Sequence, residues 1–267
     1  MKEIKGLLLD VDGVISRGGK PIEKAVEGYK LLKEHGIKTV IVSNNSTRSR
    51  RFTLERFRNF ELDVTEDEIV VATHATAKFI AEEKPSAKVY TTGEDGLKEE
   101  LRNEGLKIVE YTEAEYLVVG SNRGINFRIF TEALRLALKR EIRYVAVNPD
   151  KIFPAEDGPI PGTGLVIGAL YWMTGREPDV IVGKPSRIIM EQALERIGLR
   201  KEEVAIVGDQ IDIDIMAGKN VGIKTILVLS GVTTRETYKE MVEKYGVEPD
   251  CVFEDLYEVA QILISEK

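Results

Sequence analysis

The sequence contains little of what several common classes of site and scaffold require. Its 267 residues include one cysteine, Cys251, and two histidines, His35 and His74. One cysteine cannot form an intramolecular disulfide, and two histidines argue against a histidine phosphatase or a histidine-rich metal centre. No apolar run reaches the roughly 18 to 20 residues that a membrane span needs, and no G-x-G-x-x-G fingerprint follows a predicted strand. The composition therefore disfavours a secreted disulfide scaffold, a membrane protein and a dinucleotide-binding enzyme.

Basic residues are also in deficit. With 45 acidic and 38 basic residues the formal net charge is −7. Because the chain has no overall basic field, we do not expect nucleic acid as a partner. One local cluster of arginines is interpreted as the solvated face of a helix. Its members are Arg48, Arg50, Arg51, Arg56 and Arg58.

The beginning of the chain is charged. Residues 1–5 read MKEIK and lead straight into the first apolar run, without the apolar stretch of a signal peptide. Together with the single cysteine, this predicts a soluble protein of the cytoplasm, where thiols stay reduced.

Four short apolar runs, each followed by a polar motif, organise the sequence. They are Leu7–Leu9 before Asp10, Val40–Val42 before Ser43, Val180–Val182 before Gly183 and Lys184, and Val204–Val207 before Gly208 and Asp209. Short runs of this kind are typical of buried parallel strands, and open α/β sheets bind ligands just beyond the carboxyl ends of their strands. We therefore expect the four polar motifs to converge on one site.

The spacing of apolar residues predicts helices between these strands. Apolar positions from Ile22 to His35 fit an amphipathic helix that stops at Gly36, and the strand Thr39–Val42 follows at once. Further predicted core elements are a helix at Arg50–Asn59, strands at Ile69–Val71, Lys224–Leu229 and Cys251–Phe253, and helices at Ser186–Ile197, from Gly208 to about Ala217, Glu236–Lys244 and Leu256–Ile264. This alternation predicts an α/β fold with a doubly wound, Rossmann-like parallel sheet.

A second α/β rhythm interrupts the first. Strands are predicted at Lys88–Thr91, Tyr116–Val119 and Tyr144–Val147, with helices at Asp95–Asn103 and Phe127–Lys139. We therefore expect residues 79–179 to form an inserted domain and residues 1–78 and 180–267 to form a discontinuous core. Tyr171–Met173, inside the insert, are apolar enough to pack in a core or in an interface.

The first polar motif carries two carboxylates, Asp10 and Asp12. One carboxylate can attack phosphorus and form an aspartyl-phosphate, which divides a difficult step into two. The other, two residues on, can protonate the leaving oxygen and later activate water. Gly13 allows a tight turn at this point. A turn or a helix cap is the alternative interpretation of the motif by itself.

Asp209, Asp212 and Asp214 add three carboxylates after another predicted strand. Two carboxylates about 4 Å apart repel by roughly 4 kcal/mol at an effective dielectric constant of about 20. Several could not share one strand-end site without a cation, and ligand oxygens without histidine or cysteine favour magnesium. The alternative is a capped helix N-terminus with no metal.

The remaining motifs offer groups for an anion. Ser43, Asn44 and Asn45 supply a hydroxyl and possible backbone N–H donors, and Lys184 supplies a cation beside Pro185. Each tripeptide alone is equally typical of a turn or a surface lysine.

The ordered set Asp10-Val11-Asp12-Gly13, Ser43-Asn44-Asn45, Gly183-Lys184-Pro185 and Gly208-Asp209 with Asp214 resembles the four motifs of the haloacid dehalogenase (HAD) superfamily. The insert resembles the C2-type cap of the NagD-like, 4-nitrophenylphosphatase branch. Asn148-Pro149-Asp150 and Pro161–Gly164 are similar to cap and hinge patterns of that branch.

The resemblance implies a role for each matching residue. Asp10 would be the nucleophile and a magnesium ligand, and Asp12 the general acid and base that also ligates magnesium through its backbone carbonyl. Asp209 would be a metal ligand and Asp214 a supporting carboxylate. Ser43 and Lys184 would hold the phosphoryl oxygens, with Asn44 and Asn45 nearby.

The sequence as a whole predicts a magnesium-dependent phosphatase of small soluble phosphomonoesters, such as sugar phosphates, glycerol phosphate, phosphoglycolate, nucleotides or 4-nitrophenyl phosphate. A dehalogenase with the same nucleophile is one alternative, which Asp12 disfavours. A non-catalytic regulator that binds a phosphorylated metabolite is the other. The resemblance also makes a homodimer formed through the cap an expectation.

Overall fold

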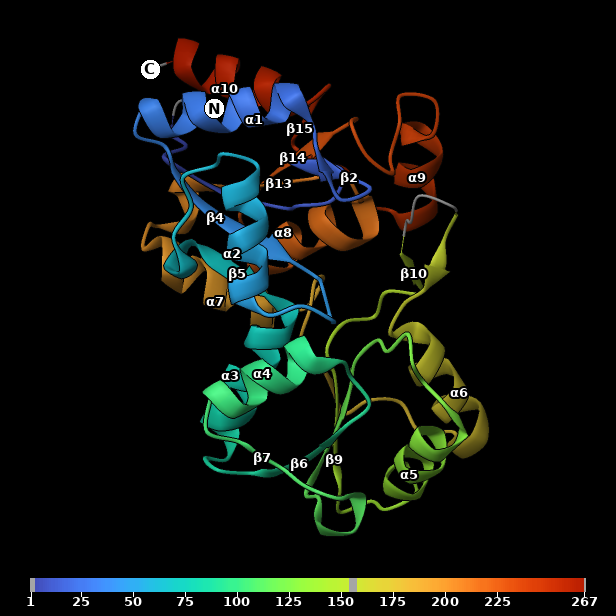
Figure 1. Ribbon diagram of the computed structural model, residues 1–267. Helices are drawn as coiled ribbons and strands as arrows, with labels where there is room; N and C mark the ends of the chain where they lie inside the picture. Colours follow the sequence, from blue (N-terminus) through green and yellow to red (C-terminus); the bar gives the residue numbers. More distant parts are fainter. Residues whose placement is uncertain (1–2, 154–157, 267) are drawn as a thin grey trace. The chain divides into compact units, whose positions relative to one another are not determined.

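The computed structural model describes residues 3–153 and 158–266 and divides into two compact units (Figure 1). The first unit comprises residues 1–43, 54–70 and 184–267, and the second comprises residues 44–53 and 71–183. This division differs from the predicted boundaries, because residues 44–53, 71–78 and 180–183 pack with the second unit. Within the described ranges, no helix is both long and apolar enough to cross a membrane.

The first unit contains a six-stranded sheet in the order β15-β14-β13-β1-β4-β5. The pairs β1–β4, β1–β13, β13–β14 and β14–β15 are parallel. From the central strand β1 the chain adds strands first on one side and later on the other, so the strand order reverses at β1. The predicted doubly wound α/β fold is confirmed.

The helices and strands of the first unit follow the predicted pattern closely. They are β1 (Gly6–Leu9), β2 (Ser16–Arg17), β3 (Lys20–Pro21), α1 (Glu23–Glu34), β4 (Lys38–Ser43), α2 (Arg50–Asn59), β5 (Ile69–Val71), α7 (Arg187–Ile197), β13 (Val204–Gly208), α8 (Met216–Val221), β14 (Lys224–Val228), α9 (Tyr238–Tyr245), β15 (Cys251–Phe253) and α10 (Leu256–Ser265). The unit boundary falls within α2 and within β5. The largest deviation is the helix after Gly208, which begins as a π-helical turn at Ile211–Ile215 and continues to Val221.

Close backbone contact joins α1 and α10, which lie side by side (Figure 1). A Cβ atom added at Gly28 of α1 would lie 2.7 Å from the Cα atom of Tyr257 in α10. Only glycine permits this approach, which lets both helices cover the sheet. Helix α10 begins at Asp255, whose side chain accepts a hydrogen bond from the N–H of Glu258 and so caps the helix.

The second unit contains its own five-stranded sheet in the order β12-β9-β8-β6-β7, with parallel pairs throughout. Its core includes Leu117, Tyr144, Val166 and Leu170. The elements are α3 (Ala72–Glu83), β6 (Lys88–Thr91), α4 (Asp95–Asn103), β7 (Lys107–Ile108), β8 (Tyr116–Val119), α5 (Phe127–Ala137), β9 (Arg143–Ala146), β10 (Ile152–Phe153), β11 (Ile160–Pro161), α6 (Gly164–Thr174) and β12 (Val180–Ile181).

One strand assignment is wrong. The run Val180–Val182 was expected to join the same sheet as the other three strands that precede polar motifs. Instead, β12 pairs with β9 of the second unit, and the N–H of Gly183 continues that ladder to the carbonyl of Val147 at 2.8 Å. The apolar run specifies a strand but not its partner, because both sheets are parallel and accept the same residue types.

Helix α6 accounts for the apolar segment Tyr171–Met173. The side chains of this segment are exposed, Trp172 by 89%. Of the two alternatives, packing in a core or in an interface, the structure excludes the first. The helix is apolar on nearly every side and therefore carries no helical period in its sequence, which is why the sequence did not predict it.

The α1–α10 contact gives a stability prediction. Replacing Gly28 by Ala is expected to lower the free energy of unfolding by about 1 to 3 kcal/mol, because the new methyl group meets backbone atoms. Gly168→Ala in α6 is the control: its Cβ meets no atom within 4 Å, so it is expected to be neutral or stabilising by up to about 1 kcal/mol. Urea unfolding of both variants tests this, and equal effects would contradict it.

Candidate active site

Three buried carboxylates, from Asp10, Asp209 and Asp214, form a cluster in the first unit. One oxygen of each lies within 4.8 Å of the others. Asp10 directly follows β1 and Asp209 directly follows β13, and these strands pair in parallel with Leu9 opposite Val207. Both carboxylates therefore emerge at the same edge of the sheet. We call the three residues the carboxylate cluster.

Asp214 reaches the cluster through the π-helical turn Ile211–Ile215. Its N–H bonds the carbonyl of Gln210 at 2.9 Å, and the N–H of Gln210 donates to Asp214 Oδ2 at 3.1 Å. The π-helical turn thus holds both the backbone N–H and the carboxylate of Asp214 against Gln210. Such turns occur frequently at functional sites. Asp212, which the sequence left without a role, is half-buried and outside the cluster.

Lys184 supplies the positive charge inside the cluster. Its ammonium donates to Asp10 Oδ1 at 2.5 Å and to Asp214 Oδ1 at 2.7 Å, and its side chain is 1% exposed. Burial by itself lowers the pKa of Lys184, but the charges of Asp10 and Asp214 outweigh burial and raise that pKa above its ordinary value. The lysine is therefore charged at neutral pH.

One ammonium does not balance three carboxylates. Burial raises the pKa of Asp10 well above its ordinary value, even though the charge of Lys184 lowers it. Burial and the charge of Asp214 raise the pKa of Asp209 to about 7. Two carboxylates at this position therefore hold protons more tightly than usual unless another cation is present.

The donor atoms fit a hard divalent cation. Among the described residues, no donor reaches the buried Oδ1 of Asp209, whereas its Oδ2 accepts the N–H of Val232 at 2.6 Å. An unsatisfied buried carboxylate oxygen is costly. A divalent ion bound by carboxylate oxygens alone is typically magnesium or calcium, so Asp10 and Asp209 are suited to hold such an ion.

Glycines make room for these carboxylates. A Cβ atom at Gly13 or Gly231 would collide with the carboxylate of Asp209, and one at Gly208 would collide with Asp214. Gly13 also has φ of 90°, a conformation that other residues rarely adopt. The carboxylates of Asp209 and Asp214 thus fit beside the backbone only because the neighbouring residues are glycines.

Asp12 lies outside the cluster although it is two residues from Asp10. Its side chain is 45% exposed and accepts hydrogen bonds from Ser16 Oγ at 3.1 Å and from Arg56 Nη2 at 3.2 Å. Arg56 was expected on a solvated helix face. Its contact with Asp12 is a feature of the site that the sequence did not indicate.

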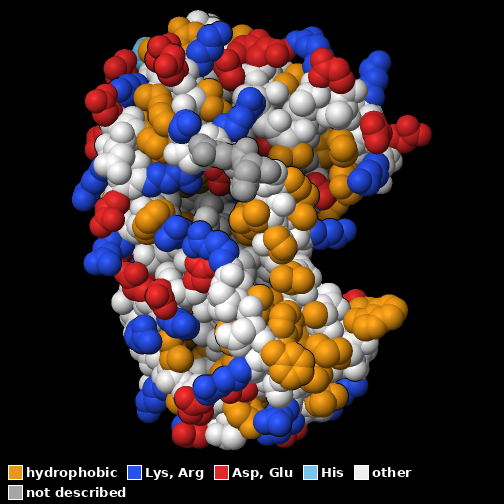
Figure 2. Space-filling model, turned by 45° about the vertical axis from the view of Figure 1, so that its right-hand side comes forward, with side chains coloured by type: hydrophobic (Ala, Val, Ile, Leu, Met, Phe, Trp, Pro, Cys, Tyr) orange, Lys and Arg blue, Asp and Glu red, His pale blue; other side chains and the backbone are white. Residues whose placement is uncertain are grey.

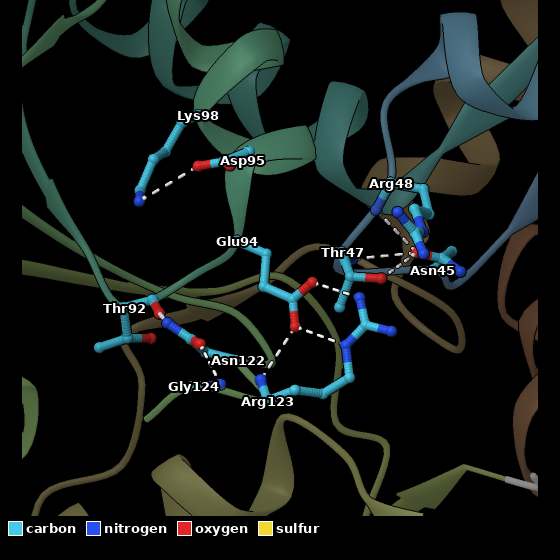
Figure 3. Close-up of polar contacts among 10 residues, drawn as sticks. All are labelled: Asn45, Thr47, Arg48, Thr92, Glu94, Asp95, Lys98, Asn122, Arg123 and Gly124. Carbon is cyan, nitrogen blue, oxygen red and sulfur yellow. Dashed lines mark hydrogen bonds and ion pairs between the residues drawn. The ribbon is translucent and has the colours of Figure 1, made fainter. Parts of the chain in front are cut away.

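The second polar motif is divided between the units. Ser43 ends β4 with its side chain buried in the first unit, next to β1 in the sheet. Asn44 and Asn45 belong to the second unit. The Asn44 amide donates to Asp150 at 3.0 Å. Asn45 Oδ1 accepts the N–H groups of Thr47 and Arg48, each at 2.9 Å (Figure 3). These contacts organise the loop after β4.

Other polar side chains of the second unit hold its loops. Glu94 accepts hydrogen bonds from the backbone N–H and the Nε of Arg123, both at 2.9 Å (Figure 3). Asn122 donates to the carbonyl of Thr92 at 2.7 Å and accepts the N–H of Gly124 at 2.8 Å. Asn148, which the sequence pattern had singled out, is fully buried and donates to the carbonyl of Asn44.

Comparison with known proteins decides the family. A family model described as haloacid dehalogenase-like hydrolase matches residues 7–107, and a second HAD-hydrolase-like model matches residues 181–259. The chain is 38% identical over 244 residues to the 5'-nucleotidase YutF of Bacillus subtilis, which covers 91% of this chain and 94% of that protein. The chain belongs to the haloacid dehalogenase-like hydrolases.

Two further HAD relatives support the same placement. The chain is 38% identical over 258 residues to an acid sugar phosphatase of Staphylococcus aureus, covering 97% of each protein. The structure of a p-nitrophenyl phosphatase from Archaeoglobus fulgidus superposes with a TM-score of 0.94 and 64% identity, covering 97% of this chain and 99% of that one. The predicted NagD-like HAD branch and the predicted phosphatase class are confirmed.

The charge balance of the cluster predicts how Asp209 affects stability. In the metal-free protein Asp209→Asn is expected to raise the melting temperature at about pH 8, since it removes a buried charge while its amide oxygen still accepts the Val232 N–H. Because the folded pKa of about 7 lies above the ordinary 3.8, the wild type loses stability as pH rises through this window, and the variant lacks that contribution.

Differential scanning fluorimetry with EDTA or with Mg²⁺, at several pH values between about 5 and 8, measures this effect. Mg²⁺ is expected to stabilise the wild type, more so at the higher pH because protons then compete less for the ligands, and to leave Asp209→Asn unaffected. Asp212→Asn, on the same turn but outside the cluster, should behave like the wild type. Equal stabilisation of Asp209→Asn by Mg²⁺ would remove Asp209 from the metal site.

Proposed function

We propose that this HAD hydrolase is a magnesium-dependent phosphatase of small phosphomonoesters that works through an aspartyl-phosphate on Asp10. The observation that carries the proposal is that the carboxylates of the cluster differ in how many of their oxygens accept hydrogen bonds. Asp214 has both oxygens hydrogen-bonded, to Lys184 and to Gln210. Asp209 keeps one buried oxygen without a donor among the described residues. These arrangements suit a supporting carboxylate and a metal ligand, respectively.

Asp10 has the arrangement of a nucleophile. Its Oδ1 accepts the hydrogen bond from Lys184, and Oδ2 accepts none from the described part of the chain. The Asp10 side chain is 10% exposed, whereas that of Asp214 is 0% exposed and Asp209 is 0% exposed as a residue. Asp10 is therefore the member of the cluster that a substrate can reach, and Lys184 holds it in position.

The reaction has two balanced steps. In the first, Asp10 Oδ2 bonds to phosphorus, the bond from phosphorus to the leaving oxygen breaks, and Asp12 gives that oxygen a proton. In the second, a water oxygen bonds to phosphorus, its proton goes to Asp12, and the bond from phosphorus to Asp10 breaks. Phosphate leaves and both carboxyl groups return to their initial state.

Positive charge at the carboxylate cluster is required in both steps. We assign the magnesium ligands to the carboxylates of Asp10 and Asp209 and the backbone carbonyl of Asp12. When bound, the ion offsets the negative charge of the cluster and of the phosphoryl oxygens. Lys184 and Ser43 are assigned to the phosphoryl oxygens, with Asn44 and Asn45 nearby.

The inserted domain, residues 79–179 of the second unit, is proposed to act as a C2-type cap that covers the site during turnover. The separate five-stranded sheet of the second unit supports this. So does the position of two chain connections: one unit boundary lies between Ser43 and Asn44 and another between Gly183 and Lys184. The chain thus passes between the units directly beside residues assigned to the phosphate.

The substrates we propose are small phosphomonoesters of the sugar phosphate, glycerol phosphate, phosphoglycolate, nucleotide or 4-nitrophenyl phosphate type. The names of the relatives, a 5'-nucleotidase, an acid sugar phosphatase and a p-nitrophenyl phosphatase, support this range. The net charge of −7 supports the absence of a nucleic-acid partner. A cytoplasmic location is proposed as well, supported by the single cysteine.

The nucleophile is tested by Asp10→Asn. This variant is expected to lose turnover by on the order of 10³-fold or more, because an amide oxygen does not form the phosphoenzyme. The measurement is phosphate release from 4-nitrophenyl phosphate and a panel of small phosphomonoesters, with and without Mg²⁺. Asp63→Asn, an exposed site in the same unit, is the control. Turnover of Asp10→Asn near the wild-type rate, or full wild-type turnover in EDTA, would contradict the proposal.

A homodimer formed through the second unit is also proposed. Apolar side chains gather over α5 and α6 (Figure 2). The most exposed apolar side chains of these helices are Phe127 of α5 and Trp172 of α6, both 89% exposed. Others that are exposed are Leu165, Tyr171 and Met173 in α6 and Leu138, which directly follows α5. An exposed apolar patch of this kind is typical of an interface, and a two-fold dimer covers the same patch on both copies.

Trp172→Ser is expected to shift the protein toward monomer in size-exclusion chromatography with light scattering. The substitution removes the largest exposed apolar side chain of the patch, and hot spots of interfaces are enriched in tryptophan. Val232→Ser, an exposed apolar site in the first unit, is expected to leave the mass unchanged. A wild type that is monomeric at every concentration would contradict the pairing.

A further inference from the structure

The carboxylate of Asp12 is held from one side only. Both of its hydrogen bonds end on Oδ1, one from Ser16 Oγ at 3.1 Å and one from Arg56 Nη2 at 3.2 Å. In the described part of the chain, Oδ2 accepts no hydrogen bond, and the side chain is 45% exposed. The orientation of Asp12 is thus fixed while one oxygen stays open.

The two donors are themselves fixed. Arg56 Nη2 also donates to Ser16 Oγ at 2.7 Å, so the three side chains form a closed triangle. Ser16 is fully buried, and its backbone forms a bridge with that of Asp12. Arg56 therefore contacts Asp12 both directly and through Ser16.

The guanidinium of Arg56 is anchored on α2. Its central carbon lies 5.5 Å from the centre of the Phe60 ring, and that ring packs edge-on against Phe57 with centroids 6.1 Å apart. Phe57 is fully buried. The Arg56 side chain is 22% exposed, so this pair is better ordered than a surface ion pair of two mobile side chains.

We infer that Arg56 is a positioning residue for the proton transfers by Asp12, an inference that rests on the proposed function. By binding Oδ1 it directs Oδ2 toward the reacting oxygen. Arg56 does not itself exchange a proton, because a guanidinium stays charged in proteins. The proton passes from Oδ2 to the leaving oxygen as the first bond breaks, and from water to Oδ2 in the second step.

The two steps need Asp12 to different degrees. An alkoxide is a strong base and requires a proton to leave, whereas 4-nitrophenolate is a weak base and leaves without one. The attack of water on the phosphoenzyme needs the general base whatever the first leaving group was. Loss of positioning should therefore slow both steps with an alkyl phosphate but only the second with 4-nitrophenyl phosphate.

Rapid mixing of Arg56→Met with 4-nitrophenyl phosphate and Mg²⁺ tests this inference. We expect a burst of 4-nitrophenolate, close to one equivalent per enzyme and within about threefold of the wild-type rate, followed by steady turnover on the order of 10²-fold slower. With an alkyl phosphate such as glycerol phosphate, turnover should fall at least as far, without a burst of product. A structural defect alone would instead reduce the burst amplitude and the steady rate in proportion.

Two variants on the same network and one off it complete the test. Ser16→Ala, which removes the other donor to Oδ1, should give the same pattern with a smaller loss. Arg56→Lys should restore part of the steady rate, because an ammonium keeps the charge but not the paired donors. Arg58→Met removes an exposed arginine from the same helix and should match the wild type.

The outcomes separate the inference from the proposed function. If the wild type is active, two results for Arg56→Met would overturn the role of Arg56 and leave the phosphatase assignment intact. One is a steady rate equal to that of the wild type, and the other is an equal loss in the burst and in the steady phase. Absence of magnesium-dependent phosphate release by the wild type would overturn the proposed function itself.

Discussion

The structure of this site depends on an unbalanced buried charge. When fully ionised, the carboxylate cluster and Lys184 together carry a net charge of −2 in a volume from which water is largely excluded. Such an arrangement is costly unless a cation completes it, and the raised pKa of Asp209, about 7, expresses that cost. The same cost provides the affinity for a divalent ion, because binding the ion removes the repulsion. The fold tolerates the cluster because glycines leave space for it and the sheet fixes its members.

The catalytic roles that we propose follow from which oxygen of each carboxylate already accepts a hydrogen bond. Four aspartates in this region differ little in intrinsic chemistry, but their surroundings differ completely: Asp214 is saturated, Asp209 has one buried open oxygen, Asp10 has one reachable oxygen, and Asp12 has one exposed open oxygen. Our proposed assignment of acid, base, nucleophile and ligand rests on these surroundings and not on residue type, as in other enzymes with several carboxylates.

Much of this organisation was predictable from the sequence. Strands ending in polar residues predicted that Asp10 and Asp209 emerge at one sheet edge. The predicted helices were located to within about two residues, except the one after Gly208, which extends to Val221 and not to Ala217. The sheet to which Val180 and Ile181 belong was not predictable, because strand pairing depends on tertiary packing that an apolar run does not encode. Helix α6 was not predicted because it lacks a polar face. The contact of Arg56 with Asp12 was not predicted either, because nothing in a helical cluster of arginines indicates which of them binds a particular carboxylate.

Arg56 and Lys184 show why the two basic side chains of this site are not interchangeable. Lys184 enters a fully buried space between two carboxylates, where a compact ammonium can donate to both. A planar guanidinium is larger and would displace one of them. Arg56 instead lies over an aromatic ring with 22% of its side chain exposed, and one of its nitrogens donates to both Ser16 and Asp12. There a flexible ammonium would lose the ring contact and the fixed direction. In the mechanism that we propose, the nucleophile Asp10 is thus paired with the cation that offsets charge, and the proton carrier Asp12 with the cation that sets geometry. The two functions stay separable although their carboxylates are two residues apart.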